Sequence, residues 1–278
     1  MTRLVAVSSL LLLLAPSLFA AADREASRAE LIIPVAGAAA GAHGTRFQTD
    51  VTLVSHSSSP NAPTLVDVYW LPRERPGTGA PVTRLVLEPR VVMFYEDFVA
   101  RTLHLEGVGS LIFRAVNEDG SRNAAGHLDA YARIWTPVPG GTGTTSQGVH
   151  ASTLYSPAVD DFQEIAGWIY GLRQDASFRT NYGIVNMGTK RLVFTVRFVT
   201  GSGTITEQVA VEAQSMTHRG VPAAATGALA ISVTPHQEIS IGNPTAPIQP
   251  WTAYGSSIDN ITGDGWYSKA QAARPHND

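Results

Sequence analysis

FQTDVTLVS at residues 47–55 returns as FRTNYGIVN at residues 178–186, 131 positions further along the chain. A second block follows in both halves, because AYA at residues 130–132 is matched by AYG at residues 253–255, at an offset of 123. Two matches in the same order and at similar spacing are typical of a duplicated domain. Neither copy carries an evident set of catalytic groups. The sequence therefore describes the architecture more fully than the activity.

The rest of the chain reads as short strands separated by turn residues. Apolar and polar residues alternate within runs of five to eight residues, and Gly, Pro, Asn or Ser clusters separate the runs. Expected strands are 31–35, 47–53, 65–71, 82–87, 91–95, 109–116 and 128–135, with one more possible at 149–155, then 165–170, 178–186, 192–200, 205–211, 229–233 and 251–259. The Ala/Gly-rich stretch 36–44 is expected to be a loop, and 96–105 a short helix or turn. This pattern predicts an all-β fold of two tandem immunoglobulin-like β-sandwich domains.

The N-terminal segment has the layout of a secretory signal peptide. Arg3 precedes an apolar run at 4–15, and three alanines at 20–22 precede Asp23. Cleavage is expected after Ala22, which predicts a periplasmic or secreted protein. The alternative is a membrane anchor, but an apolar run of about a dozen residues is short of the roughly 20 that span a bilayer. No later stretch is apolar enough to cross a membrane.

Composition narrows the class of protein further. The chain has no cysteine, which excludes disulfides and thiolate metal sites. The net charge of −3 gives no electrostatic reason to expect nucleic acid or an anionic membrane as a partner. The expected division is a signal peptide at 1–22, an N-terminal segment at 23–29, sandwich domains at 30–155 and 156–270, and a tail at 271–278. The Pro/Gly/Thr tract 137–145 resembles a linker or an exposed loop.

Six residues occupy matching places in the two halves. The pairs are Phe47 and Phe178, Asp50 and Asn181, and Tyr131 and Tyr254. One interpretation is that Asp50 and Asn181 belong to a polar site, and that the two tyrosines are exposed and stack on a sugar. The interpretation we favour is structural: each phenylalanine fills a core, the short polar side chains bond nearby backbone, and each tyrosine hydroxyl is tied to a loop.

Four aromatic residues at strand ends or in turns are better candidates for stacking on a ligand. They are Trp135, Trp251, Trp266 and Tyr267. The alternative is that they seal the edges of the cores. A carbohydrate-binding role requires two or three of them to be exposed together on one flat face.

The sequence offers only weak signs of a metal site or a catalytic site. Asn260, Thr262 and Asp264 resemble the first half of a calcium-binding loop, but the position of the last ligand holds Gln271, and a turn is the expected structure. The eight histidines show no spacing that places two imidazoles on one metal. No cofactor is expected. A Ser/His/Asp triad assembled from distant positions stays open.

The motif order resembles a family of uncharacterised secreted bacterial proteins built from tandem β-rich modules. Their pattern is G-x-x-F-x-T-D-x-x-L-V-N, followed in the second module by A-Y-x-x-x-x-D-N-x-T-G-D. Here these blocks lie at residues 44–55 and 253–264, and 171–181 matches the start of the second module. The chain departs from the pattern at Ser55, where the family has asparagine. The resemblance implies tandem β-sandwich modules and carries no active site to this chain.

These observations predict a secreted, non-catalytic binding or surface-associated protein. The partner is an unidentified protein or glycan, and the oligomeric state stays open, with strand addition at a sheet edge as one route. The two alternatives are a carbohydrate-binding accessory protein and a hydrolase whose triad is assembled in space.

Overall fold

The regular structure of the described residues is almost all β-strand. A computed structural model describes residues 28–41, 45–57, 62–138, 140–153, 166–236 and 249–273. Within these residues the regular elements are strands, apart from one helical turn, η2 (Phe98–Thr102). No described helix has the length and apolar composition that crossing a membrane requires. The expected signal peptide at 1–22 and the expected domain boundary at 155/156 lie outside the described residues.

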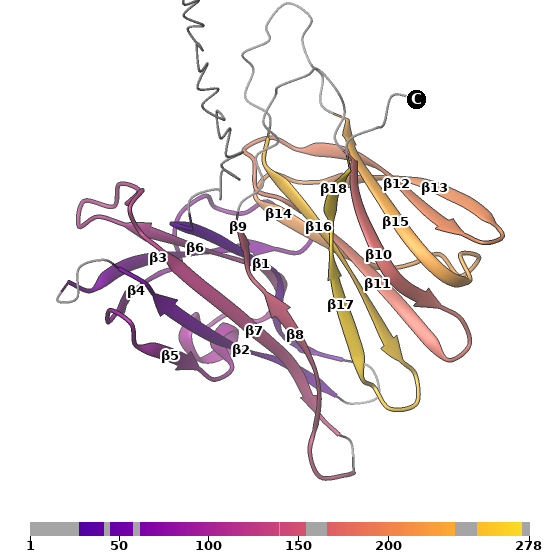
Figure 1. Cartoon of the computed structure of the whole chain (residues 1–278), viewed down its shortest axis with the longest axis horizontal. Coiled ribbons are helices and arrows are strands. Elements are labelled where there is room, and N and C mark those ends of the chain that lie inside the picture. Colours follow the sequence, from indigo (N-terminus) through magenta and orange to yellow (C-terminus); the bar gives the residue numbers. More distant parts are fainter. Residues whose placement is uncertain are drawn as a thin grey trace, which may run out of the picture.

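The first half builds two layers of strands (Figure 1, purple to pink). The strands are β1 (Glu30–Ala40), β2 (Arg46–Ser55), β3 (Thr64–Pro72), β4 (Thr83–Leu87), β5 (Val92–Tyr95), β6 (Gly107–Val116), β7 (Leu128–Pro137), β8 (Thr144–His150) and β9 (Ser152–Thr153). One layer has the order β4-β3-β6-β1, with β9 also paired to β1, and the other has the order β5-β2-β7-β8. The end of β1 pairs with β2 as well, so β1 passes from one layer to the other.

The second half repeats this arrangement (Figure 1, orange to yellow). Its strands are β10 (Ala166–Gln174), β11 (Phe178–Asn186), β12 (Leu192–Thr200), β13 (Gly203–Val211), β14 (Ser215–Gly220), β15 (Gly227–His236), β16 (Trp251–Asp259), β17 (Gly265–Lys269) and β18 (Gln271–Ala273). The orders β13-β12-β15-β10-β18 and β14-β11-β16-β17 match those of the first half strand for strand.

The pairing register of the two halves is also the same. Tyr131 on β7 lies opposite Thr52 on β2, and Tyr254 on β16 lies opposite Gly183 on β11. Gly183 stands 131 residues after Thr52, and the tyrosines are 123 residues apart. These are the two offsets read from the sequence, so the repeated motifs occupy equivalent positions in equivalent strand pairs.

Each half encloses its own apolar core between its layers. In the first half the fully buried side chains include Ile33, Leu53, Leu87, Phe98, Leu111, Phe113 and Leu128. In the second they include Ile169, Tyr182, Ile184, Phe194, Val196, Phe198 and Ile231. Burying a large apolar side chain contributes roughly 1.5–3 kcal/mol, and the described residues contain no cysteine, so these two clusters stabilise the sheets without crosslinks. The sheets therefore pack as sandwiches.

The expected loop at 36–44 is wrong in its first part, because β1 continues through the small residues to Ala40. Space for a side chain is tight at Gly37. A Cβ added to Gly37 would lie 3.0 Å from the carbonyl oxygen of Gly107 on the neighbouring strand β6. Small residues thus allow β1 to pass closely between two strands, a packing reason that periodicity does not reveal.

Three other expectations need correction. Of the two alternatives for the tract 137–145, the exposed loop fits and the linker does not: β8 begins at Thr144, and the described part of the tract turns the chain between β7 and β8. Strands β14 and β17 were not expected, because their polar residues hide the alternation. The expected tail begins with β18, which pairs with β10. The turn expected near 96–105 is present as η2.

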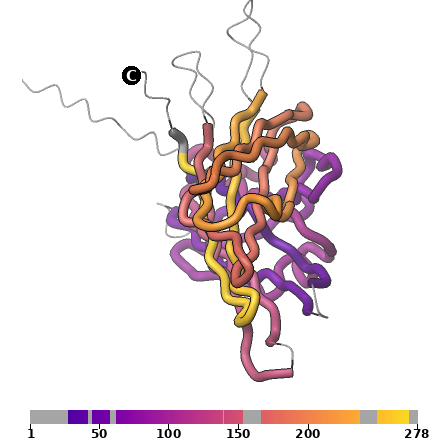
Figure 2. Tube along the Cα trace, turned by 90° about the vertical axis from the view of Figure 1, so that its right-hand side faces the viewer, coloured from indigo at the N-terminus to yellow at the C-terminus, as the bar shows by residue number. Residues whose placement is uncertain are grey.

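The two halves pack against each other through a third apolar cluster. Ile32, Leu71 and Ile112 come from one layer of the first half, and Val185, Met187, Met216 and Tyr254 from the second half. Backbone bonds join the halves as well, since the amide of Glu74 donates to the carbonyl of Met216 at 2.9 Å. In the view turned by 90° about the vertical axis, the second half lies in front of the purple strands of the first half (Figure 2).

Candidate binding surface

The threonine that recurs in the two motifs is hydrogen-bonded to the first strand of each half, β1 or β10. Thr49 is buried, and its Oγ1 both accepts from the amide of Gly37 (2.8 Å) and donates to the Gly37 carbonyl (2.9 Å). Thr180 donates in the same way to the carbonyl of Arg173. Gly37 and Arg173 are equivalent positions on β1 and β10. The motif's polar side chains thus satisfy backbone groups where a strand leaves its layer, as the structural interpretation expected.

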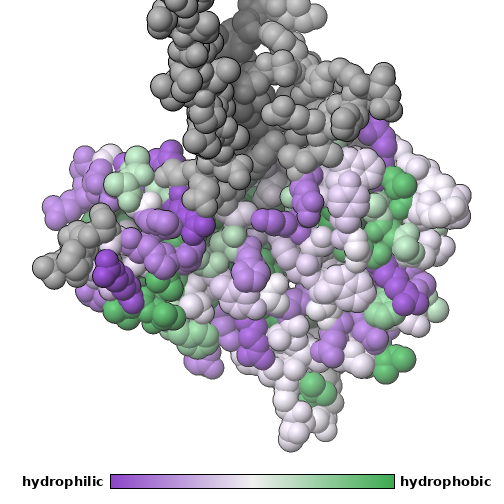
Figure 3. All heavy atoms as spheres, viewed as in Figure 1, coloured by the Kyte–Doolittle hydropathy of each residue, from purple (hydrophilic) through white to green (hydrophobic). Residues whose placement is uncertain are grey.

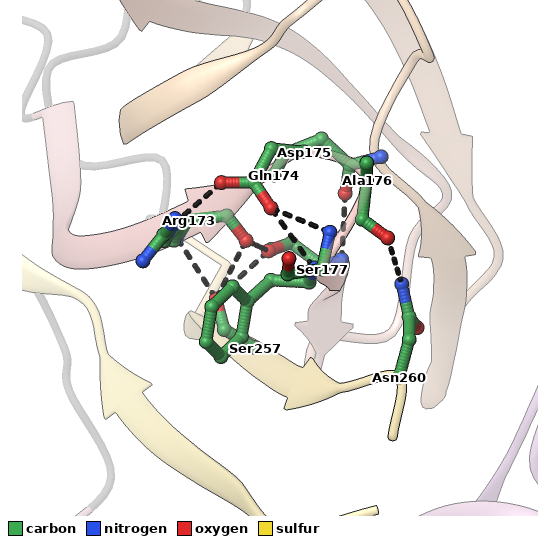
Figure 4. A network of polar contacts seen from close by, with 9 residues as sticks. Arg173, Gln174, Asp175, Ala176, Ser177, Ser257 and Asn260 are labelled. Carbon is green, nitrogen blue, oxygen red and sulfur yellow. Dashed lines mark hydrogen bonds and ion pairs between the residues drawn. The ribbon is translucent and has the colours of Figure 1, made fainter.

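A network of polar contacts surrounds this position in the second half (Figure 4). Ser257 bonds to Thr180 through the two hydroxyls (2.7 Å) and accepts from the Arg173 amide (3.0 Å). Asp175 accepts from the amides of Ser177 and Phe178 and pairs with the Arg173 guanidinium at 2.5 Å. The Arg173 hydrogen bond lowers the pKa of the Asp175 carboxyl. These polar groups are engaged in shaping the turn between β10 and β11.

The repeated phenylalanines are not core residues. Phe47 and Phe178 are each only partly buried at the start of β2 and β11. Phe178 packs edge-on against Trp266 with ring centroids 5.6 Å apart, and the Arg173 guanidinium lies 4.4 Å from its ring centre. The expectation that these rings fill the two cores is therefore wrong, because neither ring belongs to a core cluster and both lie near the start of a strand.

Asp50 and Asn181 differ in environment although they occupy equivalent positions. Asp50 is buried, accepts a hydrogen bond from the amide of Asp97 at 3.0 Å, and lies 3.7 Å from the Arg133 guanidinium. Asn181 is partly exposed between β14 and β16. The carboxylate of Asp50 holds the turn before η2 and is engaged in the fold.

The two equivalent tyrosines show the largest difference between the halves. Tyr254 is fully buried, and its hydroxyl lies 2.8 Å from Nδ1 of His218. Its ring stacks on His218 and on Tyr267, with centroids 6.1 and 5.7 Å away. Tyr131, by contrast, is 37% exposed and contacts His150 edge-on at 5.0 Å. Neither arrangement is the expected hydroxyl bond to a loop backbone.

Gly183 is required beside the buried tyrosine. A Cβ built at this position would meet three atoms of the Tyr254 ring and hydroxyl at 2.3–2.5 Å. We therefore expect Gly183→Ala to destabilise the protein by roughly 1–3 kcal/mol, because the ring must move within a packed interface. Urea unfolding followed by tryptophan fluorescence measures this loss.

The equivalent position in the first half supplies the matched control. Thr52 already carries a Cβ and lies opposite the exposed Tyr131, so Thr52→Ala is expected to change stability by about 0.5 kcal/mol or less. Equal losses for the two substitutions would show that contact with Tyr254 does not determine the requirement for glycine.

The outer face of the layer β5-β2-β7-β8 carries the two most exposed large apolar residues of the described first half. Phe94, Thr52, Tyr131 and His150 are direct partners across its four strands, so they share this face. Val92 and Val54 form a second such pair beside them. Phe94 and Val92 are each 64% exposed, and a hydrophobic patch lies over β5 in Figure 3.

The equivalent face of the second half is covered. Its row contains His218, Gly183, Tyr254 and Lys269, and its second pair is Met216 and Val185. Of these, Met216, Val185 and Tyr254 pack against the first half. One surface thus occurs twice in the chain, once as an internal interface and once open to solvent. Clustered exposed apolar residues mark interaction sites in soluble proteins.

The sequence did not single out Val92 or Phe94. A signal was present, because VVMFY at residues 91–95 is apolar at every position, whereas a strand with one solvated face alternates. In the structure Met93 and Tyr95 pack against the first core, and Val92 and Phe94 point away from it. A short strand that is apolar on both faces indicates a second apolar contact.

The four aromatic candidates do not gather on one face. Trp251 is buried in the second core against Phe194. Trp266 and Tyr267 are consecutive on β17 and so point to opposite faces, and the Trp266 indole donates to the Gly171 carbonyl at 2.6 Å. Trp135 lies on β7 in the first half, beside Arg133. The flat stacking platform required for a sugar site is not built from these residues.

The calcium-like loop forms a hydrogen-bonded turn. Asp259 accepts from the amides of Ile261 (2.7 Å) and Thr262 (2.9 Å), and Thr262 accepts from the amide of Asp264 (3.1 Å). The Asn260 oxygen accepts from the Arg179 guanidinium. Among the described residues, no group of three or more His, Asp or Glu side chains could hold a metal ion.

Three histidine contacts bear on a spatially assembled triad. His236 contacts the hydroxyl of Thr195, His218 contacts that of Tyr254, and His56 lies 2.8 Å from Asp129. Within the described part of the chain, none of these three contacts forms a hydrogen-bonded series of hydroxyl, imidazole and carboxylate. The geometry that activates a nucleophile requires all three in line.

Comparison with known proteins adds no relative. No protein-family model matches the chain, and no curated protein matches it.

Proposed function

We propose that the chain is a secreted, non-catalytic binding protein of two tandem immunoglobulin-like modules, and that it binds a protein partner through the outer face of β5-β2-β7-β8. The signal-like N-terminus supports export. The matching strand orders and separate cores of the two halves support two modules of one type. The observation that carries the proposal is that the outer face of β14-β11-β16-β17 is covered by the first half, whereas the equivalent face of β5-β2-β7-β8 is exposed.

The chemistry of this face favours a protein over a sugar. Val92, Val54 and Phe94 offer aliphatic and aromatic carbon in a compact patch, which a protein surface covers by apolar burial. A sugar is held by aromatic platforms together with free polar groups. Here the most buried polar group on the face, the Asp50 carboxylate, already bonds to backbone and lies near Arg133.

A photo-crosslinking amino acid tests whether this face meets a protein. Replacement of Phe94 by p-benzoyl-phenylalanine in the native host is expected to give crosslinked products that mass spectrometry identifies. The same replacement at Val86 is the matched control, because Val86 is also an exposed strand residue (52%) but lies on β4. Its yield is expected to be at least tenfold lower. An absence of products at position 94, or equal yields at the two positions, would refute the proposed surface.

A further inference from the structure

The contact between the two halves shows which surface covers the repeated face. Ile32, Leu71 and Ile112, on β1, β3 and β6, lie against Val185, Met216 and Tyr254. The outer face of one layer of the first half is thus seated on the outer face of the opposite layer of the second half. Ser215 also donates to the carbonyl of Pro72 across this contact at 2.8 Å.

This contact joins different surfaces of the two copies, so each half retains one unused surface. The first half retains the outer face of β5-β2-β7-β8, with Val54, Val92 and Tyr131 at the positions of Val185, Met216 and Tyr254. The second half retains the outer face of β13-β12-β15-β10-β18. Contacts of this head-to-tail kind continue unless a rotation closes them into a ring.

The unused face of the second half is equipped for contact. By strand pairing, Trp168 stands at the position of Ile32, Val199 at that of Leu71 and Ser232 at that of Ile112. Trp168 stacks on Tyr170 with ring centroids 5.8 Å apart and planes at 6°. Tyr170 is 49% exposed. Tyrosine and tryptophan are the residues most enriched at protein contacts, because they bury a large area with few rotatable bonds.

We propose that the partner of the exposed face is a second copy of this chain. The face of β13-β12-β15-β10-β18 in one molecule covers the face of β5-β2-β7-β8 in the next, continuing between molecules the contact made within each. The inference rests on the proposed function, because it names the occupant of the same surface. The product is a linear or closed chain of molecules.

Two single substitutions on opposite faces test this assembly. Sedimentation velocity of the purified protein over a concentration series is expected to show species larger than a dimer. Phe94→Glu, on the first half, and Tyr170→Glu, on the second, each place a charge in the contact and are expected to weaken self-association at least tenfold. Val86→Glu is expected to leave it unchanged. Far-UV circular dichroism verifies that each variant is folded.

Mixing the two variants discriminates a head-to-tail contact from a symmetric one. The Phe94→Glu protein keeps its second-half face, and the Tyr170→Glu protein keeps its first-half face. An equimolar mixture is therefore expected to form a 1:1 dimer that grows no further. A symmetric dimer would not be restored by mixing, and that result would overturn the inference.

The two experiments together distinguish a failure of self-assembly from a failure of the proposed binding surface. A protein that stays monomeric at millimolar concentration, but crosslinks to a different protein through position 94, refutes self-assembly and leaves the binding surface standing. A protein that is monomeric and gives no products at position 94 refutes both.

Discussion

Tyr254→Ala is expected to lower the free energy of unfolding by about 3–5 kcal/mol, the usual cost of removing a large buried aromatic ring. The ring is fully buried at the contact between the halves and is stacked between His218 and Tyr267. Its loss leaves a cavity lined by these rings and removes the hydroxyl partner of His218. Urea unfolding at neutral pH measures the change.

The repeat supplies the control for this experiment. Tyr131→Ala removes the same side chain from the equivalent position on an exposed face, and a loss of about 1 kcal/mol or less is expected. If Tyr254→Ala does not fold, Tyr254→Phe leaves the ring and removes only the hydroxyl, for an expected loss of about 1–2 kcal/mol. Equal losses at positions 131 and 254 would contradict the packing of the halves described above.

Stability is expected to fall as the pH drops from 6.5 towards 4. Burial, with the nearby positive charge of Arg73, lowers the pKa of His218 from 6.5 to about 4. The unfolded chain therefore binds a proton in this window that the folded chain does not. The contribution of neutral His218 is fully present above pH 6.5, declines by up to about 1.4 kcal/mol per pH unit, and is lost below pH 4.

His218→Gln isolates this effect, because glutamine keeps hydrogen-bonding groups near Tyr254 and does not titrate. Urea midpoints measured at half-unit steps between pH 7.5 and 4.5 are expected to fall less in the variant than in the parent protein. The carboxyls of Asp119, Asp175 and Asp259 do not contribute to the fall in urea midpoint over this pH range. Their pKa values are lowered from 3.8, so their contributions are lost only below that pH. Parallel curves would exclude His218 as the cause.

Local sequence predicted the strands and the duplication because both depend on short-range patterns. The run at 178–186 reads as a strand and is one, and the offsets of 131 and 123 reappear as identical strand registers. The small residues of β1 were misread because their packing depends on Gly107 of a distant strand. Glycine content alone indicates a loop and says nothing of two backbones in close contact.

The candidate surface was harder to predict for a similar reason. Nothing in the sequence near Tyr131 or Tyr254 states which of the two is covered, because the covering residues Ile32, Leu71 and Ile112 lie far away in the chain. The candidates chosen for their chemistry, such as Trp251, are core residues. The apolar run at 91–95 is the usable signal, because a strand that is apolar on both faces indicates a second apolar contact.

The glycine at position 183 and the threonine at position 52 differ in the substitutions that they tolerate. Substitution at 183 brings new atoms against an aromatic ring, whereas position 52 already holds a threonine side chain on a partly exposed face. The two equivalent positions are thus under unequal restraint. The first half can change at position 52 without a clash inside its own module, while the second half is held to glycine at position 183 by the Tyr254 ring.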